Sequence, residues 1–181
     1  ANMNLKSVYE DADKLSDKLS DTFDNGLQLL NYAISETRSI SQNLLPKAIQ
    51  DYGLELAIES LVNQLKKSTK ITFYLYHNVD NVELPENVQI NLYRITQEAL
   101  NNAIRHGQPD TINVQLIYSM GEILLTIEDD GVGFDVHGKE AGGLGLRSMK
   151  TRVGAMSANL DIISNLGRGT IVSVVVPINS E

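Results

Sequence analysis

The 181-residue sequence contains no cysteine, which excludes disulfide bonds and thiolate metal sites. This absence suits a reducing compartment, and we expect a cytoplasmic location, either of a cytoplasmic protein or of the cytoplasmic part of a membrane-anchored receptor. No apolar run approaches the length of about 20 residues that a membrane-spanning helix needs. The N-terminal stretch ANMNLKSVYEDADKL is too polar for a signal peptide. We therefore expect no membrane contact within this sequence.

Basic residues are also scarce, because 15 Lys and Arg stand against 23 Asp and Glu and give a net charge of −8. This charge repels nucleic acid and anionic membranes, so neither is an expected partner. An anionic nucleotide would bind only through a local device, such as backbone amides or a divalent cation. Hydrophobic residues make up 42% of the chain, which is typical of a globular protein. Because the sequence begins at Ala1 and not at Met, we expect processing or a cut from a longer chain.

The first 46 residues are predicted to form an antiparallel helical hairpin. Apolar residues recur there at intervals of three and four along two segments, separated by the turn-forming stretch SDTFDNG. Pro46 is expected to close the second helix. The two apolar stripes need a partner surface, which favours a homodimer; the alternative is that both helices fold back on the rest of the chain. The stripes are Leu5, Val8, Ala12, Leu15 and Leu19, then Leu27, Leu30, Ile34, Ile40 and Leu44.

Residues 47–181 are predicted to form a second domain of mixed structure. Its pattern predicts a two-layer α/β (α+β) sandwich, with helices on one face of a mixed, largely antiparallel sheet. Met120-Gly121 is expected to turn a hairpin between two alternating runs. The expected helices are 53–69, 86–107 and 146–156, and the expected strands are 71–77, 111–119, 122–128, 158–164 and 169–177.

Two glycine-containing segments have the features of a ligand site. In IEDDGVGFD, residues 127–135, a strand ends at Asp129, where a carboxylate can accept a hydrogen bond from a ligand amino group. The glycines that follow let a ligand approach the backbone closely. In GGLGLRSMKTR, glycines precede a helix N-terminus, which offers free N–H groups to phosphate. Taken singly, a tight turn capped by acids or an ordinary helix start explains each segment about as well.

The stretch QEALNNAIRHG, residues 97–107, places Glu98 and Asn102 beside the apolar stripe of a helix. A carboxylate and an amide at the edge of a buried face are costly unless they are paired. They therefore indicate either a ligand wall or a polar edge that simply meets water.

Together and in this order, these segments resemble the ATP-binding domain shared by sensor histidine kinases, DNA gyrase, heat-shock chaperone ATPases and mismatch-repair ATPases. QEALNNAIRH resembles its N box, DDGVG and GGLGL its two glycine boxes, and GRGT with IVSVVVP its closing strands. LYRITQEALNNAIRHG, ISQNLLP and GGLGLRSMKTRV are similar to the histidine kinases that are paired with helix-turn-helix response regulators. The resemblance implies the Bergerat-type ATP-binding fold, with ATP and Mg²⁺ as ligands.

The resemblance also implies roles for individual residues. Glu98 would be catalytic and orient water or substrate, and Asn102 would hold the Mg²⁺ that bridges the phosphates. Asp129 would accept a hydrogen bond from the adenine amino group, above a floor shaped by Gly131 and Gly133. The remaining nucleotide contacts would come from Arg105, His106, Gly143, Leu144, Gly145 and Thr170. Residues 134–142 would form a mobile lid.

The family's phosphoacceptor histidine has no counterpart in residues 1–45, since the three histidines are His77, His106 and His137. We therefore expect a catalytic fragment that binds ATP without phosphorylating itself. In the intact protein the phosphoryl group would pass to a histidine and then to an aspartate of a response regulator. One alternative is a serine kinase of the same superfamily, against which the hairpin argues. The other is a non-catalytic dimerisation and interaction module.

Overall fold

The computed structural model describes residues 47–79, 82–136 and 143–178. The chain divides into two units, Ala1–Leu44 and Leu45–Glu181, and every described residue lies in the second. The predicted helical hairpin, its dimer contact and most of the predicted lid, including His137, lie outside the described residues. They remain predictions.

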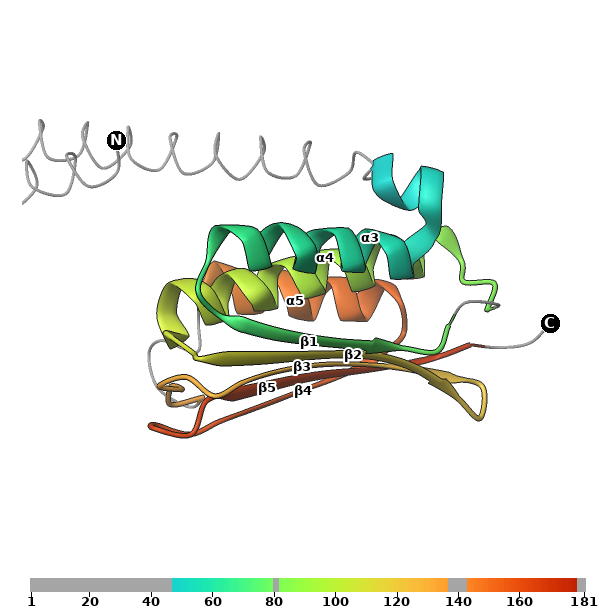
Figure 1. Ribbon diagram of the computed structural model, residues 1–181. Helices are drawn as coiled ribbons and strands as arrows, with labels where there is room; N and C mark the ends of the chain where they lie inside the picture. The colour runs from blue at the N-terminus through green and yellow to red at the C-terminus, as the bar shows by residue number, and fades with distance from the viewer. Residues whose placement is uncertain (1–46, 80–81, 137–142, 179–181) are drawn as a thin grey trace, which may run out of the picture. The chain divides into compact units, whose positions relative to one another are not determined.

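The described residues form one sheet with helices on one side (Figure 1). Its strand order is β1-β2-β3-β5-β4, with β1 parallel to β2 and all other neighbours antiparallel. This arrangement confirms the predicted sandwich with a mixed, largely antiparallel sheet. The elements are α3 (Lys47–Ser68), β1 (Thr72–His77), α4 (Glu86–Asn102), η2 (Ala103–Gly107), β2 (Thr111–Ser119), β3 (Glu122–Asp129), α5 (Leu144–Ala155), β4 (Asn159–Ser164) and β5 (Thr170–Pro177).

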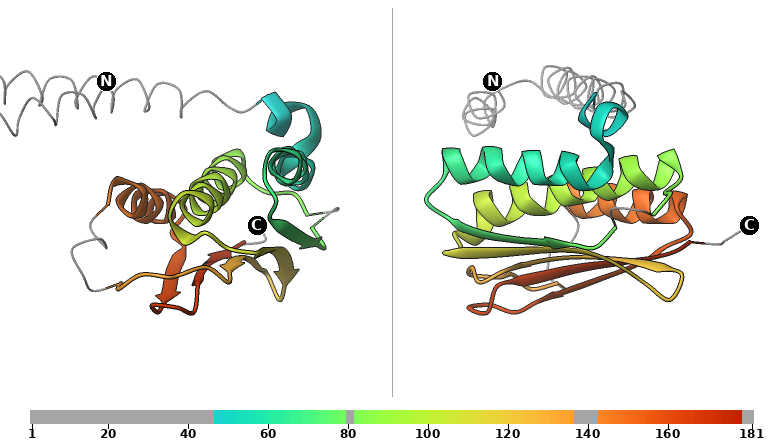
Figure 2. Two further views of the ribbon diagram at one scale, coloured as in Figure 1. Left: turned by 60° about the vertical axis from the view of Figure 1, so that its left-hand side comes forward. Right: turned by 45° about the vertical axis from the view of Figure 1, so that its right-hand side comes forward.

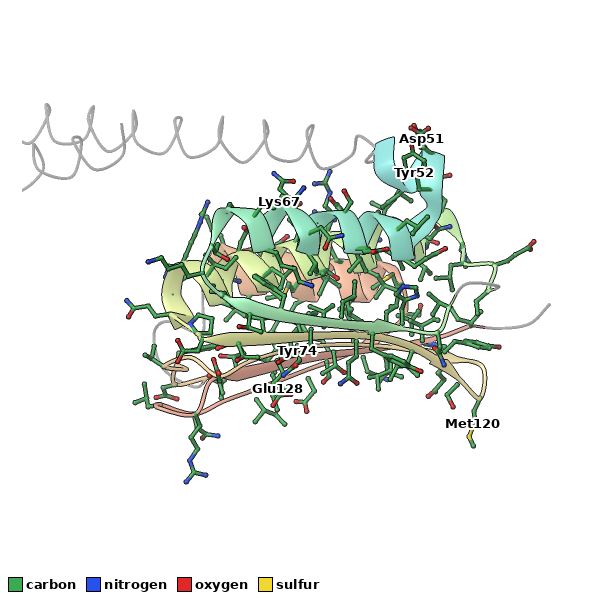
Figure 3. The ribbon with its side chains drawn as sticks, in the orientation of Figure 1. Asp51, Tyr52, Lys67, Tyr74, Met120 and Glu128 are labelled. Atoms are coloured by element: carbon green, nitrogen blue, oxygen red, sulfur yellow. The ribbon has the colours of Figure 1, made fainter. Side chains whose placement is uncertain are left out.

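The helices α3, α4 and α5 lie side by side on the same face of the sheet (Figures 1 and 2). α4 is the middle helix, because it contacts both α3 and α5 as well as β3. It also supplies the crossover that the parallel pair β1 and β2 requires. On the opposite face Tyr74 and Glu128 are exposed (Figure 3). No helix in the described part of the chain is long and apolar enough to cross a membrane.

The core lies between the sheet and the helices, and alternation along the strands determines which residues enter it. Ile123, Leu125 and Ile127 of β3 are buried, and so are alternate residues of β2 and β5. Side chains two residues apart share a face of a sheet. The next residue of this series in β3 is Asp129, so a carboxylate lies on the helix-covered face where the apolar residues end.

Two helices differ from their predicted bounds. α3 begins at Lys47 and not at residue 53, and it is kinked at Gly53, whose φ of 82° and ψ of 176° are non-helical. Glycine adopts this conformation without a steric penalty, so the helix continues on either side of it. The third predicted helix begins two residues early, at Leu144.

The predicted helix 86–107 consists of two parts, because the regular α-helix ends at Asn102. Ala103–Gly107 forms a π-helical turn, and Gln108 then ends it in the left-handed conformation with a φ of 50°. Pro109 follows and has no N–H with which to continue the helix. π-Helical turns of this kind are frequent at functional sites.

Candidate functional site

A row of polar side chains crosses the end of the sheet on its helix-covered face. Asp129 of β3 is the register partner of Thr170 in β5, and Thr170 is the register partner of Ser164 in β4. Asp129 is only 7% exposed and Ser164 only 6%. Buried polar groups of this kind are stable only when hydrogen bonds replace the lost water.

The carboxylate of Asp129 receives one such bond, from the backbone N–H of Gly131 to Oδ1 at 2.9 Å. Burial raises the pKa of Asp129 above its ordinary value, and the charge of Asp130 adds to this effect. The backbone N–H groups of Gly131 and Thr170 act against it and lower the pKa. Asp129 is therefore a desolvated acceptor that a ligand N–H group can satisfy.

The neighbouring acid, Asp130, has a different task. It is exposed, and its Oδ1 accepts hydrogen bonds of 2.9 Å from the backbone N–H groups of Asp110 and Thr111. These bonds fasten the start of β2 to the end of β3. The pair of acids in IEDDG thus divides into one residue that faces the interior and one that joins two strands.

The loop that follows Asp129 is held on both sides by the backbone. Val132 N–H donates to Gly107 O at 2.8 Å, and Gly167 N–H donates to Val132 O at 2.6 Å. A side chain at Gly131 would overlap Gly107 O, and one at Gly133 would overlap Asn165 O. Only glycine fits at these two positions, so the loop lies close against the end of η2 and the β4–β5 turn.

The opposite wall of the site comes from α4 and the start of α5. Glu98 and Asn102 are half-buried and lie one turn apart on α4. A Cβ on Gly145 would overlap Glu98 Oε1 and would lie 3.2 Å from Asn102 Nδ2, so this glycine lets α5 approach α4 closely. α5 has no acidic residue of its own in its first turn, so beside Glu98 of α4 the positive end of its dipole is available to an anion.

Charged groups continue along the contact between α4 and α5. Arg152 Nη1 donates to Asn91 Oδ1 at 3.2 Å. Burial lowers the pKa of Arg152, the charge of Arg94 lowers it further, and the charge of Glu98 raises it. Glu98 therefore lies near both the start of α5 and a cationic side chain.

These walls enclose a cavity of about 620 Å³, within the range that is usual for small-molecule sites. Eight of the residues expected at the site line it: Asn102, His106, Asp129, Gly133, Gly143, Leu144, Gly145 and Thr170. Apolar residues from the same helices and strands, among them Ala103, Ile127 and Met149, complete the lining.

Three other expected site residues do not line the cavity. Gly131 lies behind Asp129 and donates to it. Glu98 lies behind Gly145, and the side chain of Arg105 is exposed. Sequence reasoning missed Ser164, which is buried beside Thr170. Alternation could have found it, because in β4 it lies two residues after Ile162, which lines the cavity.

This fold agrees with known proteins. Residues 87–180 match the family of histidine kinase-, DNA gyrase B- and HSP90-like ATPases, and the chain belongs to this family. The proteins to which the chain is similar are sensor histidine kinases, which confirms the family resemblance inferred from the sequence. Membership of an ATPase family implies that the chain binds ATP.

Individual relatives make the similarity concrete. The sensor protein VraS of Staphylococcus haemolyticus is 30% identical over 185 residues, which cover 100% of this chain and 51% of that protein. The chain thus spans about half the length of the curated relatives that it matches.

Two solved structures agree with the fold. The histidine kinase domain of a blue-light activated kinase from Erythrobacter litoralis EL346 has a TM-score of 0.57 and 25% identity, over 68% of this chain and 58% of that one. The histidine kinase AdeS of Acinetobacter baumannii has a TM-score of 0.63 over 99% of this chain and 93% of that one. Its identity of 14% shows the fold alone.

Proposed function

We propose that this chain is the catalytic part of a cytoplasmic two-component sensor histidine kinase, which transfers the γ-phosphoryl group of ATP to a histidine outside this sequence. The observation that carries the proposal is that one cavity contains both a buried carboxylate, Asp129, and the N-terminus of α5. The carboxylate suits a base with an amino group, and the helix N-terminus suits a phosphate chain.

The proposed roles follow the two sides of the cavity. Asp129 and Thr170 would bind the base, and Gly131 and Gly133 would let the loop after Asp129 pack closely and shape the floor beneath the base. The backbone of Gly143, Leu144 and Gly145 would bind the phosphates, with His106 and Arg105 from the end of the N-box helix.

The α4–α5 wall suits a Mg²⁺ ion that the protein shares with the nucleotide phosphates. The described residues contain no group of three or more His, Asp or Glu side chains that could hold a metal by themselves. Mg²⁺ bound with a nucleotide needs only one or two protein ligands, because phosphates and water supply the others. Asn102, with an amide oxygen and a place in the cavity lining, would be the ligand. When bound, the ion would neutralise phosphate charge in a protein of net charge −8.

In the proposed reaction a histidine nitrogen attacks the γ-phosphorus, the bond to the bridging oxygen of ADP breaks, and the ring N–H proton would pass to the carboxylate of Glu98. The phosphoryl group then passes to an aspartate of a response regulator. The chain contributes mainly position and charge. Glu98 would be the catalytic acid or base beside the phosphates, held by its contacts with Gly145 and its proximity to Arg152.

A labelling experiment tests this proposal. The chain incubated with γ-labelled ATP should gain no acid-labile phosphate, because His77, His106 and His137 do not match the family's acceptor position. An N-terminally extended chain that includes the acceptor histidine should become labelled, and Asp129→Ala should strongly reduce that labelling at ATP concentrations that do not saturate the variant. Stable phosphohistidine on the present chain would overturn the proposal.

We further propose that residues 1–46 mediate homodimerisation. Light scattering should then give a dimer for the chain and a monomer after their deletion. A monomer in both cases would contradict a dimer built by these residues.

A further inference from the structure

Ser164 lies behind Thr170, outside the cavity lining, and takes part in three hydrogen bonds. Its Oγ accepts from the backbone N–H of Phe134 at 2.9 Å and donates to Gly169 O at 2.9 Å. It also lies 2.9 Å from Thr170 Oγ1, a contact in which either hydroxyl could donate by distance alone. These bonds connect β4, the turn before β5 and the first residue of the predicted lid.

The three bonds together decide which hydroxyl donates. A serine hydroxyl has one proton and two lone pairs. Gly169 is buried, its carbonyl oxygen can only accept, and an unpartnered buried carbonyl is costly. The Ser164 proton therefore goes to Gly169 O. Its two lone pairs then receive the Phe134 N–H and the hydroxyl proton of Thr170.

The turn conformation fixes this arrangement. Gly169 has a φ of 75°, and a side chain there would overlap Asp129 O. The backbone that aims Gly169 O at Ser164 is therefore packed against the strand that carries Asp129. Ser164 has no freedom to redirect its proton without leaving that carbonyl unpaired.

We propose that Ser164 determines the ligand specificity of this site by making Thr170 a hydrogen-bond acceptor only. Thr170 lines the cavity and has no proton left for a ligand. Its register partner Asp129 is an acceptor as well when it is ionised. This part of the floor thus offers no side-chain donor, and the ligand must bring the protons itself. A base with an exocyclic amino group meets this demand, whereas one with a carbonyl in the same place does not.

This inference rests on the proposed function, and a comparison of two nucleotides tests it. ATP and inosine triphosphate differ at the 6-position, where ATP has an amino group and inosine triphosphate has a carbonyl, and at the neighbouring N1, which is an acceptor in ATP and carries a proton in inosine triphosphate. Calorimetric titration of the wild-type chain with each should give tighter binding of ATP. In Ser164→Ala the Thr170 hydroxyl is released and can donate. The preference for ATP should then fall about fivefold, the usual value of one neutral hydrogen bond.

Two further variants separate specificity from support of the fold. Thr170→Val has no hydroxyl, so adding Ser164→Ala to it should change the nucleotide preference no further. Ser164→Cys keeps a slightly larger side chain whose sulfur is only a weak acceptor for the Thr170 proton, so it should shift the preference in the same direction. It carries the test if Ser164→Ala does not fold, as judged by circular dichroism.

The outcomes distinguish the inference from the function beneath it. A wild-type chain that binds neither nucleotide would overturn the proposed function. A wild-type chain that binds ATP, with an unchanged preference in both Ser164 variants, would overturn only the specificity role. An equal loss of affinity for both nucleotides would also overturn it, because that result would make Ser164 a purely structural residue.

Discussion

The floor of the cavity and its α4–α5 wall are built in different ways. At the floor, Gly131, Gly133 and Gly169 each lie so close to another backbone segment that a Cβ would overlap it. The wall consists of side chains and a helix end, and both Gly143 and Leu144 are exposed there. A floor closed by backbone cannot adjust to its ligand, whereas a wall of side chains can. This difference suits a site that recognises one base rigidly and holds a phosphate chain with a metal ion more loosely.

The strongest test of a rigid floor compares two glycines in the same turn. Gly167 and Gly169 have φ values of 76° and 75°, but a Cβ would overlap Asp129 O only at Gly169. We expect Gly167→Ala to lower the free energy of unfolding by about 1–2 kcal/mol, the cost of the left-handed conformation. Gly169→Ala should cost about 1–3 kcal/mol more because of the overlap.

Urea denaturation without nucleotide measures both changes. An equal decrease in the free energy of unfolding of the two variants would mean that the floor adjusts to the added methyl group. The contrast between a rigid floor and an adaptable wall would then be wrong.

The two adjacent acids give the next largest effect. Asp129→Ala should weaken ATP binding about ten- to a hundredfold, since a hydrogen bond to a charged group contributes about 1.5–3 kcal/mol. Asp130→Ala should leave ATP affinity nearly unchanged and lower stability instead, because Asp130 accepts from Asp110 and Thr111. Calorimetric titration and urea denaturation of both variants check this. Wild-type affinity in Asp129→Ala would remove this residue from the site.

A smaller effect is expected at the wall. Asn102→Ala should weaken ATP binding several-fold when magnesium is present and little when a chelator removes it, because an amide oxygen suits a hard cation. Titrations of the wild type and the variant under both conditions decide the matter. The same loss in both conditions would make Asn102 a structural residue of α4.

The smallest expected effect is a pH dependence. As the pH rises through the pKa of Asp129, the free energy of unfolding should decrease and the affinity for ATP should increase. Because the pKa of Asp129 is raised, the folded state holds this proton more tightly than the unfolded state does. The contribution of Asp129 to stability is thus present when the pH is below 3.8, the ordinary pKa of an aspartate, and it is lost as the pH rises through the raised pKa. In the proposed site the ionised carboxylate of Asp129 accepts from the ATP amino group, so ATP affinity should fall as the pH decreases through that pKa.

Asp129→Asn is the matched control, because asparagine does not titrate, whereas ATP and all other titratable groups of the protein are unchanged. The difference between wild type and variant, measured over the acidic range, isolates Asp129. Parallel pH profiles for the two proteins would contradict the assignment.

The sequence predicted the fold well because its strands alternate clearly. The series Ile123, Leu125, Ile127 identifies the buried face of β3, and it places Asp129 on that face. Asp129, and not Asp130, was already the expected ligand acceptor because of its place at the strand end. What alternation cannot show is which backbone groups a side chain meets, so the strand-joining role of Asp130 became visible only in the structure.

Other features depended on contacts that no local pattern contains. The pairing of Ser164 with Gly169 O needs the left-handed backbone of a turn, and the contact of Gly145 with Glu98 needs two helices to meet. Arg152 near Glu98 likewise joins residues that are far apart in the chain. The helical residues before Gly53 were missed, because the predicted helix began at this glycine, whose backbone is non-helical in the structure.

The central claim is that the cavity between Asp129 and the start of α5 binds Mg-ATP. Calorimetric titration of the chain with Mg-ATP tests it most directly. We predict saturable binding of one nucleotide per chain, weakened at least tenfold in Asp129→Ala. The absence of saturable binding by the folded wild-type chain would contradict this account.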